Sequence, residues 1–155
     1  MPGQSIFRSL EPLLEQVSKP IQYVGGELNS TVKPWDVGGE HTVRWALMYP
    51  DAYEVGVPNQ GVMILYEVLN ERADALAERT YAVWPDLEAL MREHQVPQFT
   101  VDAHRPVGDF DLFGLSFTGL VRAVKGIFGW RNFRTGMLTT NFAEAGGFIK
   151  SQPQE

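Results

Sequence analysis

Strand and helix patterns alternate along the middle of the chain. Residues 42–48 alternate between two largely apolar faces, which predicts a strand covered by helices on both sides. Further strands are predicted at 79–84, at 98–101 as a short edge strand, and at 111–117. The segment 111–117 is nearly continuous in apolar residues and is therefore expected to be central. Together these elements predict a Rossmann-like α/β fold with an open, mainly parallel sheet and flanking helices.

Two helices are predicted between these strands. Asn59 is a plausible N-cap for a helix over 61–71, and Pro85 suits the first position of a helix that ends near His94. Residues 118–128 are compatible with a further helix, and the pattern decays from Gly129 with no clear fifth strand, which leaves open whether the sheet is complete.

The first part of the chain has a different character. Apolar residues at helical spacing predict a helix within 5–17, where Pro12 fits the first turn if the helix begins near Leu10. Residues 20–30 predict an extended arm with a turn at Gly25–Gly26. We therefore divide the chain into an N-terminal helix and arm (1–40), a Rossmann-like domain (41–117) and a divergent tail that is partly helical and partly disordered (118–155).

Ligands of parallel sheets bind beyond the carboxyl ends of the strands, so the loops at those ends are the candidate binding site. The loop 49–61 offers polar groups, glycines that permit close backbone approach, and a helix N-terminus suited to an anion. The candidate binding residues are Tyr49, Asp51, Tyr53, Glu54, Gly56, Asn59, Gly61, Trp84 and Ser116.

An alternative interpretation stays open for this loop. Tyr53 and Val55 would then only cover the top of the sheet, and Trp84 would close the core. The fingerprint GxGxxG is absent, which argues against an ordinary NAD site. Ser116 lacks the GxSxG context of a hydrolase nucleophile, so no catalytic residue is predicted.

Composition excludes several classes of function. The net charge of -6 argues against nucleic acid as the main partner, since phosphate binding needs a basic surface. The absence of cysteine excludes disulfides and cysteine-ligated clusters in this chain. We found no signal peptide and no run near the roughly 18 apolar residues that span a bilayer, so a soluble, cytoplasmic protein without membrane contact is expected.

Several ordered blocks resemble a known family: PIQYVGGELNS, RWALMYPDAYEVGVPNQGVMILYEVLN, ERTYAVWPDLEALMRE and DAHRPVGDFDLFGLSF. Over about residues 10–117 they resemble the N-terminal part of cobalamin-binding-domain radical SAM proteins of the YgiQ-like group. The resemblance implies a cobalamin-type Rossmann module. In the family a barrel follows, whose CxxxCxxC motif binds the iron–sulfur cluster that cleaves S-adenosylmethionine. This chain has no cysteine, so those two groups are expected only in the full-length family.

The segment Asp102–Gly108 is similar to the DxHxxG motif of cobalamin modules, in which a histidine replaces the lower axial base of cobalt. Here the glycine comes one residue late, and the segment precedes the last predicted strand instead of following the first. We therefore interpret His104 as a loop histidine paired with Asp102. Cobalamin bound without a histidine ligand stays open.

The sequence thus predicts a cobalamin-binding-like module of a radical SAM protein that does not catalyse by itself, with cobalamin as candidate cofactor and no metal ligands. The expected partner is a radical SAM catalytic chain, or a second copy joined through an exposed sheet edge. A non-enzymatic interaction module and a vestigial fragment are the alternatives. The resemblance ends near Phe117, so we expect a truncation before the barrel. A truncated gene, a frameshifted end and a stand-alone protein stay open.

Overall fold

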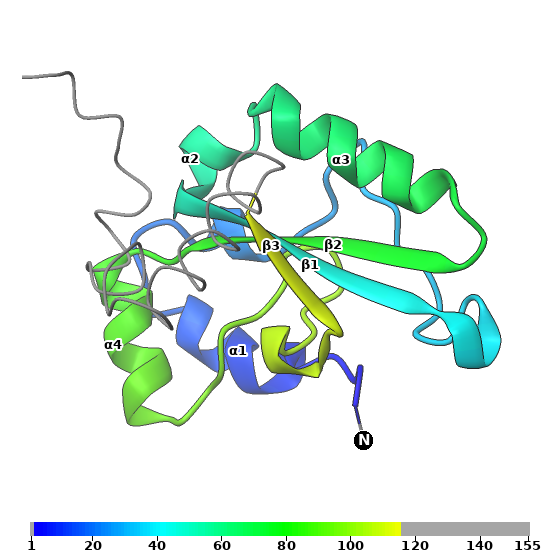
Figure 1. The fold of residues 1–155 in the computed structure, drawn as a ribbon. Helices are drawn as coiled ribbons and strands as arrows, with labels where there is room; N and C mark the ends of the chain where they lie inside the picture. Colours follow the sequence, from blue (N-terminus) through cyan, green and yellow to red (C-terminus); the bar gives the residue numbers. More distant parts are fainter. Residues whose placement is uncertain (1, 116–155) are drawn as a thin grey trace, which may run out of the picture.

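A computed structural model describes residues 2–115 as a parallel sheet with helices on both faces (Figure 1). In the described part of the chain the strand order is β2-β1-β3, with β1 (Val43–Ala52) between β2 (Ala75–Ala82) and β3 (Leu112–Leu115). Both pairings are parallel, which confirms the predicted Rossmann-like α/β class.

The prediction that the last strand is central is wrong for the described residues, because β1 pairs with both of its neighbours. Leu112 and Phe113 of β3 are 42% and 47% exposed. An apolar run shows that a strand has apolar side chains, but it does not show which strands flank it.

Both long strands extend beyond their predicted bounds. β1 continues through Pro50 and Asp51, where a loop was predicted. Its pairing with β2 is irregular between Tyr49 and Ala52, and a proline is tolerated where the ladder is interrupted. β2 begins at Ala75, four residues earlier than predicted, and carries the buried charged residues Glu78 and Arg79.

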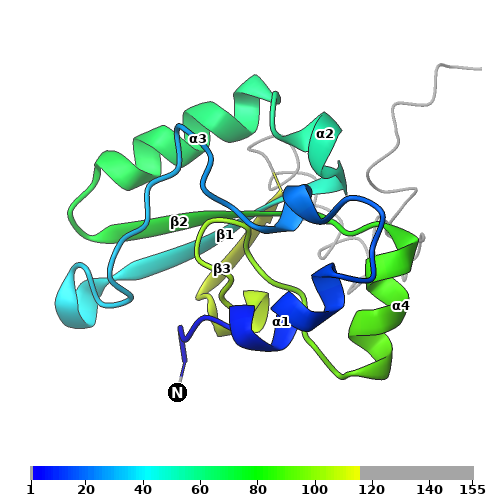
Figure 2. The same cartoon turned by 180° about the vertical axis from the view of Figure 1, so that it is seen from behind.

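The helices form two layers, visible from both sides in Figures 1 and 2. α3 (Gln60–Glu71) covers one face of the sheet, where Val62 and Tyr66 pack against Leu47 and Ala77. α1 (Phe7–Leu14) and α4 (Pro85–Glu93) pack together on the other face. The core between them contains Leu10, Leu13, Leu14, Leu87 and Met91, with Tyr23 and Phe99.

Four short elements complete the described chain. They are α2 (Tyr53–Gly56) and the 3-10 helices η1 (Pro20–Tyr23), η2 (Gly39–His41) and η3 (Val107–Asp109). Gly25 and Gly26 adopt φ of 71° and 83°, but the turn of the arm lies at Leu28 and Asn29 and not at the two glycines as predicted.

The starts of α3 and α4 were predicted correctly, whereas α1 begins at Phe7 and not near Leu10. The side chain of Asn59 accepts a hydrogen bond from the Val62 amide, and Pro85 is the first residue of α4, as predicted. Pro12, however, lies in the second half of α1 and not in its first turn. The missing N–H affects only one short helix, whose three leucines are buried.

Residues 98–101 do not form the predicted edge strand. Phe99 makes only an isolated bridge to Pro106. The segment instead lies along β2: the Val101 amide donates to the Arg79 carbonyl over 2.8 Å, and the Arg79 amide donates to Asp102 Oδ2 over 2.6 Å. This outer edge of the sheet is therefore covered.

Arg79 and Asp102 also form a buried ion pair. Their side chains are 1% and 0% exposed and approach to 2.7 Å. Asp102 Oδ1 accepts further hydrogen bonds from Ser30 Oγ (2.6 Å) and the Tyr66 hydroxyl (3.2 Å). One carboxylate thus joins β2, α3 and the arm.

Among residues 2–115, we find no helix with both the length and the apolarity needed to cross a membrane. The predicted tail, 118–155, lies outside the described residues.

We expect Asp102→Asn to lower the free energy of unfolding by about 3–5 kcal/mol, because the change leaves the Arg79 charge buried without a counter-charge. Urea denaturation measures the loss. Asp74→Asn is the matched control, since Asp74 pairs with Arg72 at the surface and its loss should be much smaller. Equal losses for the two variants would contradict this role of Asp102.

Candidate functional site

The carboxyl ends of β1 and β2 lie beside α2, the start of α4 and η1. We call this surface the rim and define it as residues 19–27, 49–61 and 84–86. Several predicted binding residues meet there: Trp84 Nε1 lies 3.4 Å from Glu54 Oε2, and Gly56 packs between the rings of Tyr49 and Tyr81.

The other predicted binding residues do not take part in these contacts of the rim. Asp51 Oδ1 bonds the adjacent Ala52 amide over 2.7 Å and is exposed. Asn59 is occupied as the N-cap of α3, and Gly61 is exposed in the first turn of that helix. Ser116 lies outside the described residues.

A lysine that the sequence analysis did not identify closes one side of the rim. Lys19 Nζ lies 2.7 Å from Glu54 Oε1 and 4.0 Å from the centre of the Trp84 ring. The hydrogen bond from Lys19 is the main reason that the pKa of Glu54 falls to about 2. Glu54 is therefore ionised at neutral pH and does not serve as a proton donor.

A second polar contact joins the arm to α2. The Tyr53 hydroxyl donates a hydrogen bond to Glu27 Oε1. Burial, with this bond to Glu27, raises the pKa of Tyr53, so the phenol stays protonated at neutral pH. The Tyr53 ring also meets Tyr81 edge to face, with 5.6 Å between centroids.

The two predicted glycines have different surroundings. A Cβ on Gly56 would lie 2.3 Å from Tyr81 Cδ1, so the missing side chain lets α2 pack on the aromatic rings. A Cβ on Gly61 would meet only Asn59 Oδ1, at 3.3 Å. At Gly56 the structure therefore favours the interpretation that the loop covers the top of the sheet.

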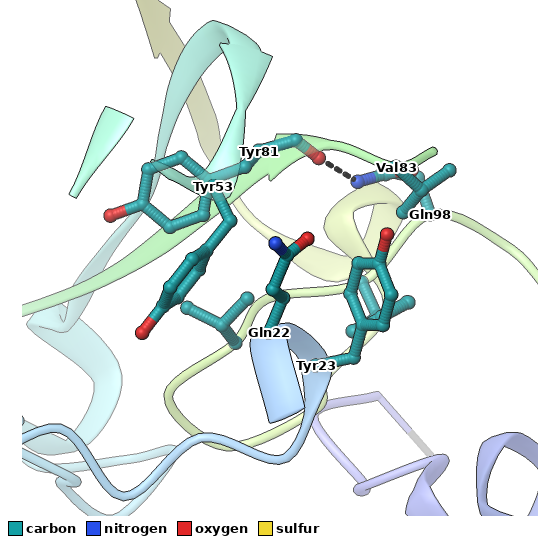
Figure 3. A pocket seen from close by; sticks show the side chains of 8 residues that line it. Gln22, Tyr23, Tyr53, Tyr81, Val83 and Gln98 are labelled. Atoms are coloured by element: carbon teal, nitrogen blue, oxygen red, sulfur yellow. Dashed lines mark hydrogen bonds between the residues drawn. The ribbon is translucent and has the colours of Figure 1, made fainter. Parts of the chain in front are cut away.

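Tyr53 is one of the residues that line a small cavity of about 10 Å³ (Figure 3). It is lined by Gln22, Tyr23, Tyr53, Tyr81, Val83, Gln98, Phe99 and Val101. Gln22, Tyr23 and Gln98 come from η1 and from the segment after α4. No spacing in the sequence connects these segments, which is why sequence reasoning missed them.

The predicted pairing of His104 with Asp102 is wrong, because Asp102 is occupied by Arg79. His104 Nε2 lies 2.8 Å from the Tyr23 carbonyl oxygen, and its ring packs against Phe7 and Phe99. Burial lowers the pKa of His104, which favours the neutral imidazole. The backbone of His104 also adopts a left-handed conformation, with a φ of 55°, which the sequence did not indicate.

The remaining titratable candidates do not form a metal site. Within residues 2–115 we find no group of three or more His, Asp or Glu side chains placed to hold a metal ion. His41 and His94 are exposed. Asp109 accepts a bond from the Gly3 amide, whereas Asp111 pairs with Arg44, so the two carboxylates serve separate contacts.

We expect the Glu54 carboxyl to titrate near 2 in carbon-detected NMR, and Lys19→Met to move its pKa back toward the ordinary value of 4.5. The depressed pKa means that this ion pair stabilises the fold above pH 4.5 and that its contribution disappears as the pH falls toward 2. An unchanged titration in Lys19→Met would show that Lys19 is not the cause.

We expect Gly56→Ala to destabilise the fold by about 1–3 kcal/mol, because its methyl group would overlap the Tyr81 ring. Thermal or urea unfolding measures the change. Gly108→Ala is the control, since a Cβ there meets no atom within 4 Å. A stable Gly56→Ala protein would mean that α2 does not pack as described.

Comparison with known proteins gives one match. Residues 61–119 match the family model described as radical SAM proteins, N-terminal. No curated protein matches the chain. No solved structure matches it either. The matched segment runs from the start of α3 to just beyond β3, and it supports the resemblance to the N-terminal part of a radical SAM protein.

Proposed function

We propose that the chain is a non-catalytic, ligand-binding N-terminal module of a radical SAM protein, with the rim as its binding face. The observation that carries the proposal is a set of exposed apolar side chains around the rim. Ile21, Val24, Val55 and Trp84 are 74%, 39%, 48% and 36% exposed. Exposed apolar side chains supply contact area for a ligand, and the rim lies at the carboxyl ends of the strands, where parallel sheets bind ligands.

The polar groups of the rim support binding and not catalysis. Glu54 is held ionised by Lys19, and Tyr53 donates to Glu27. Neither group is poised near neutral pH as a general acid or base. The reaction would then belong to a radical SAM catalytic chain, which we propose as the partner.

Cobalamin is the ligand that the family resemblance implies, and one binding mode does not fit the described residues. His104 is 9% exposed, and its Nε2 is engaged by the Tyr23 carbonyl. It is therefore not available as a ligand to cobalt. We propose a corrinoid that rests on the apolar rim residues with no histidine below the metal.

Hydroxocobalamin binding tests this proposal. Equilibrium dialysis, followed by gel filtration with a visible spectrum, should show corrinoid bound to the protein. Val55→Glu should weaken binding about tenfold or more, because it places a charge beneath an apolar ligand surface. Val68→Glu is the matched control: Val68 is an exposed valine on α3, away from the rim, and binding should not change.

Two results would contradict the proposal. The first is that no corrinoid stays with the protein. The second is that the Val55 and Val68 variants lose binding equally, which would place the ligand elsewhere.

An interaction module is the second candidate function, and exposed residues of β3 favour it. The outer edge of β2 is covered by residues 99–106, so strand addition there is blocked. Leu112 and Phe113, in contrast, expose apolar side chains on β3. A stable dimer in light scattering, without bound corrinoid, would favour this candidate over the first.

A further inference from the structure

A buried hydrogen-bond acceptor without a partner lies at the small cavity beneath the rim. Gln22 is 5% exposed, and its Oε1 has no hydrogen-bond partner. In Figure 3 the Gln22 carboxamide lies between the Tyr23 ring on one side and the Tyr53 and Tyr81 rings on the other.

None of the neighbouring polar groups around this cavity forms a hydrogen bond to Gln22 Oε1. Gln98 Nε2 donates to Thr80 Oγ1 and to the Tyr81 carbonyl, each over 2.9 Å. The Tyr23 hydroxyl accepts a bond from the Trp84 amide at 3.0 Å. The Tyr53 hydroxyl donates to Glu27 and, in Figure 3, points away from Gln22.

Tyr81 does not satisfy Gln22 either. Its hydroxyl is buried and without a partner, but in Figure 3 it also points away from Gln22. The cavity therefore presents the carboxamide oxygen of Gln22 as its unsatisfied acceptor. A buried acceptor left unpaired costs stability, and an apolar side chain at position 22 would avoid that cost.

Size and charge define the group that would satisfy Gln22. The volume of about 10 Å³ admits one water-sized group. The group must donate a hydrogen bond, because Oε1 only accepts. It must also be neutral, since no carboxylate lines the cavity to compensate a cation. A hydroxyl group or the NH₂ end of a primary amide meets all three conditions.

We infer that this cavity is a subsite in which Gln22 anchors a primary amide or hydroxyl group of a ligand bound on the rim. The inference rests on the proposed function in placing the rest of the ligand on the rim. Its test uses a small probe and not a corrinoid. If hydroxocobalamin does not bind, the proposed function is contradicted but the subsite is not. If the small probe does not bind, the subsite is contradicted but corrinoid binding is not.

Acetamide and N,N-dimethylacetamide are the probes, because only the first carries N–H donors. In nitrogen–proton NMR, acetamide should shift the side-chain amide signals of Gln22 saturably, and N,N-dimethylacetamide should not. Gln22→Met should weaken acetamide binding at least tenfold, followed through backbone amides of the cavity lining. Gln4→Met is the matched control, since Gln4 is an exposed glutamine that precedes α1 and lies outside the rim.

A stability measurement gives an independent readout. Without probe, Gln22→Met should raise the Tm by about 4 °C or more, because it removes a buried, unpaired oxygen. Gln4→Met should leave the Tm unchanged.

Several outcomes would overturn the inference. They are the absence of a saturable shift, equal shifts with both probes, or a Gln22→Met protein with a lower Tm and undiminished acetamide binding. If Gln22→Met does not fold, the comparison of the two probes on the unaltered protein decides the question.

Discussion

The buried ion pair between Arg79 and Asp102 is the interaction on which the described fold most depends. Arg79 lies within β2, where a charged side chain is costly unless it is paired. The Asp102 carboxylate accepts hydrogen bonds from both the guanidinium and the backbone amide of Arg79. The pair therefore compensates a buried charge and covers the outer edge of β2, two problems that an open sheet must solve.

The position of the arm follows from the same carboxylate. Asp102 accepts a bond from Ser30 Oγ, and Arg79 Nη1 lies 3.3 Å from Asn29 Oδ1. The Tyr66 hydroxyl of α3 accepts a hydrogen bond from the Thr31 amide over 2.6 Å, so the arm is also attached to the helix layer. With residues 29–31 held there, Glu27 reaches Tyr53. The rim is thus built partly from a segment that the sequence predicted to lie outside the Rossmann-like domain.

This construction limits what the rim can do. Its charged groups are used to hold η1, α2 and Trp84 together, as the contacts of Lys19 with Glu54 and with the indole ring show. Ionisable groups paired in this way are poor acids and bases near neutral pH, but they fix the position of the apolar side chains around them. For this reason we propose the rim as a surface that holds a ligand and not as one that performs the chemistry.

The sequence by itself determined the elements with strong periodicity and local capping signals. These are β1, α3 with its Asn59 cap, and α4 with Pro85 at its first position. Such features depend on neighbours three or four residues apart, or on alternate residues of one strand, so a single segment contains the information. The parallel class of the sheet followed from the order of those elements, as did the position of a candidate site at their carboxyl ends.

Only the tertiary structure decided the rest. By residue type, Glu78 and Arg79 are typical of a surface segment. They are buried because each forms an ion pair with a residue more than 20 positions away in the sequence, Glu78 with Arg105 and Arg79 with Asp102. From the sequence, Asp102 was predicted to pair with His104. In the structure Asp102 pairs with Arg79, and His104 contacts the Tyr23 carbonyl oxygen instead. Contacts between distant segments also explain why Gln22, Lys19 and Glu27 belong to the rim. Burial, pairing and the shape of a cavity depend on contacts between distant segments, and these contacts exist only once the chain has folded.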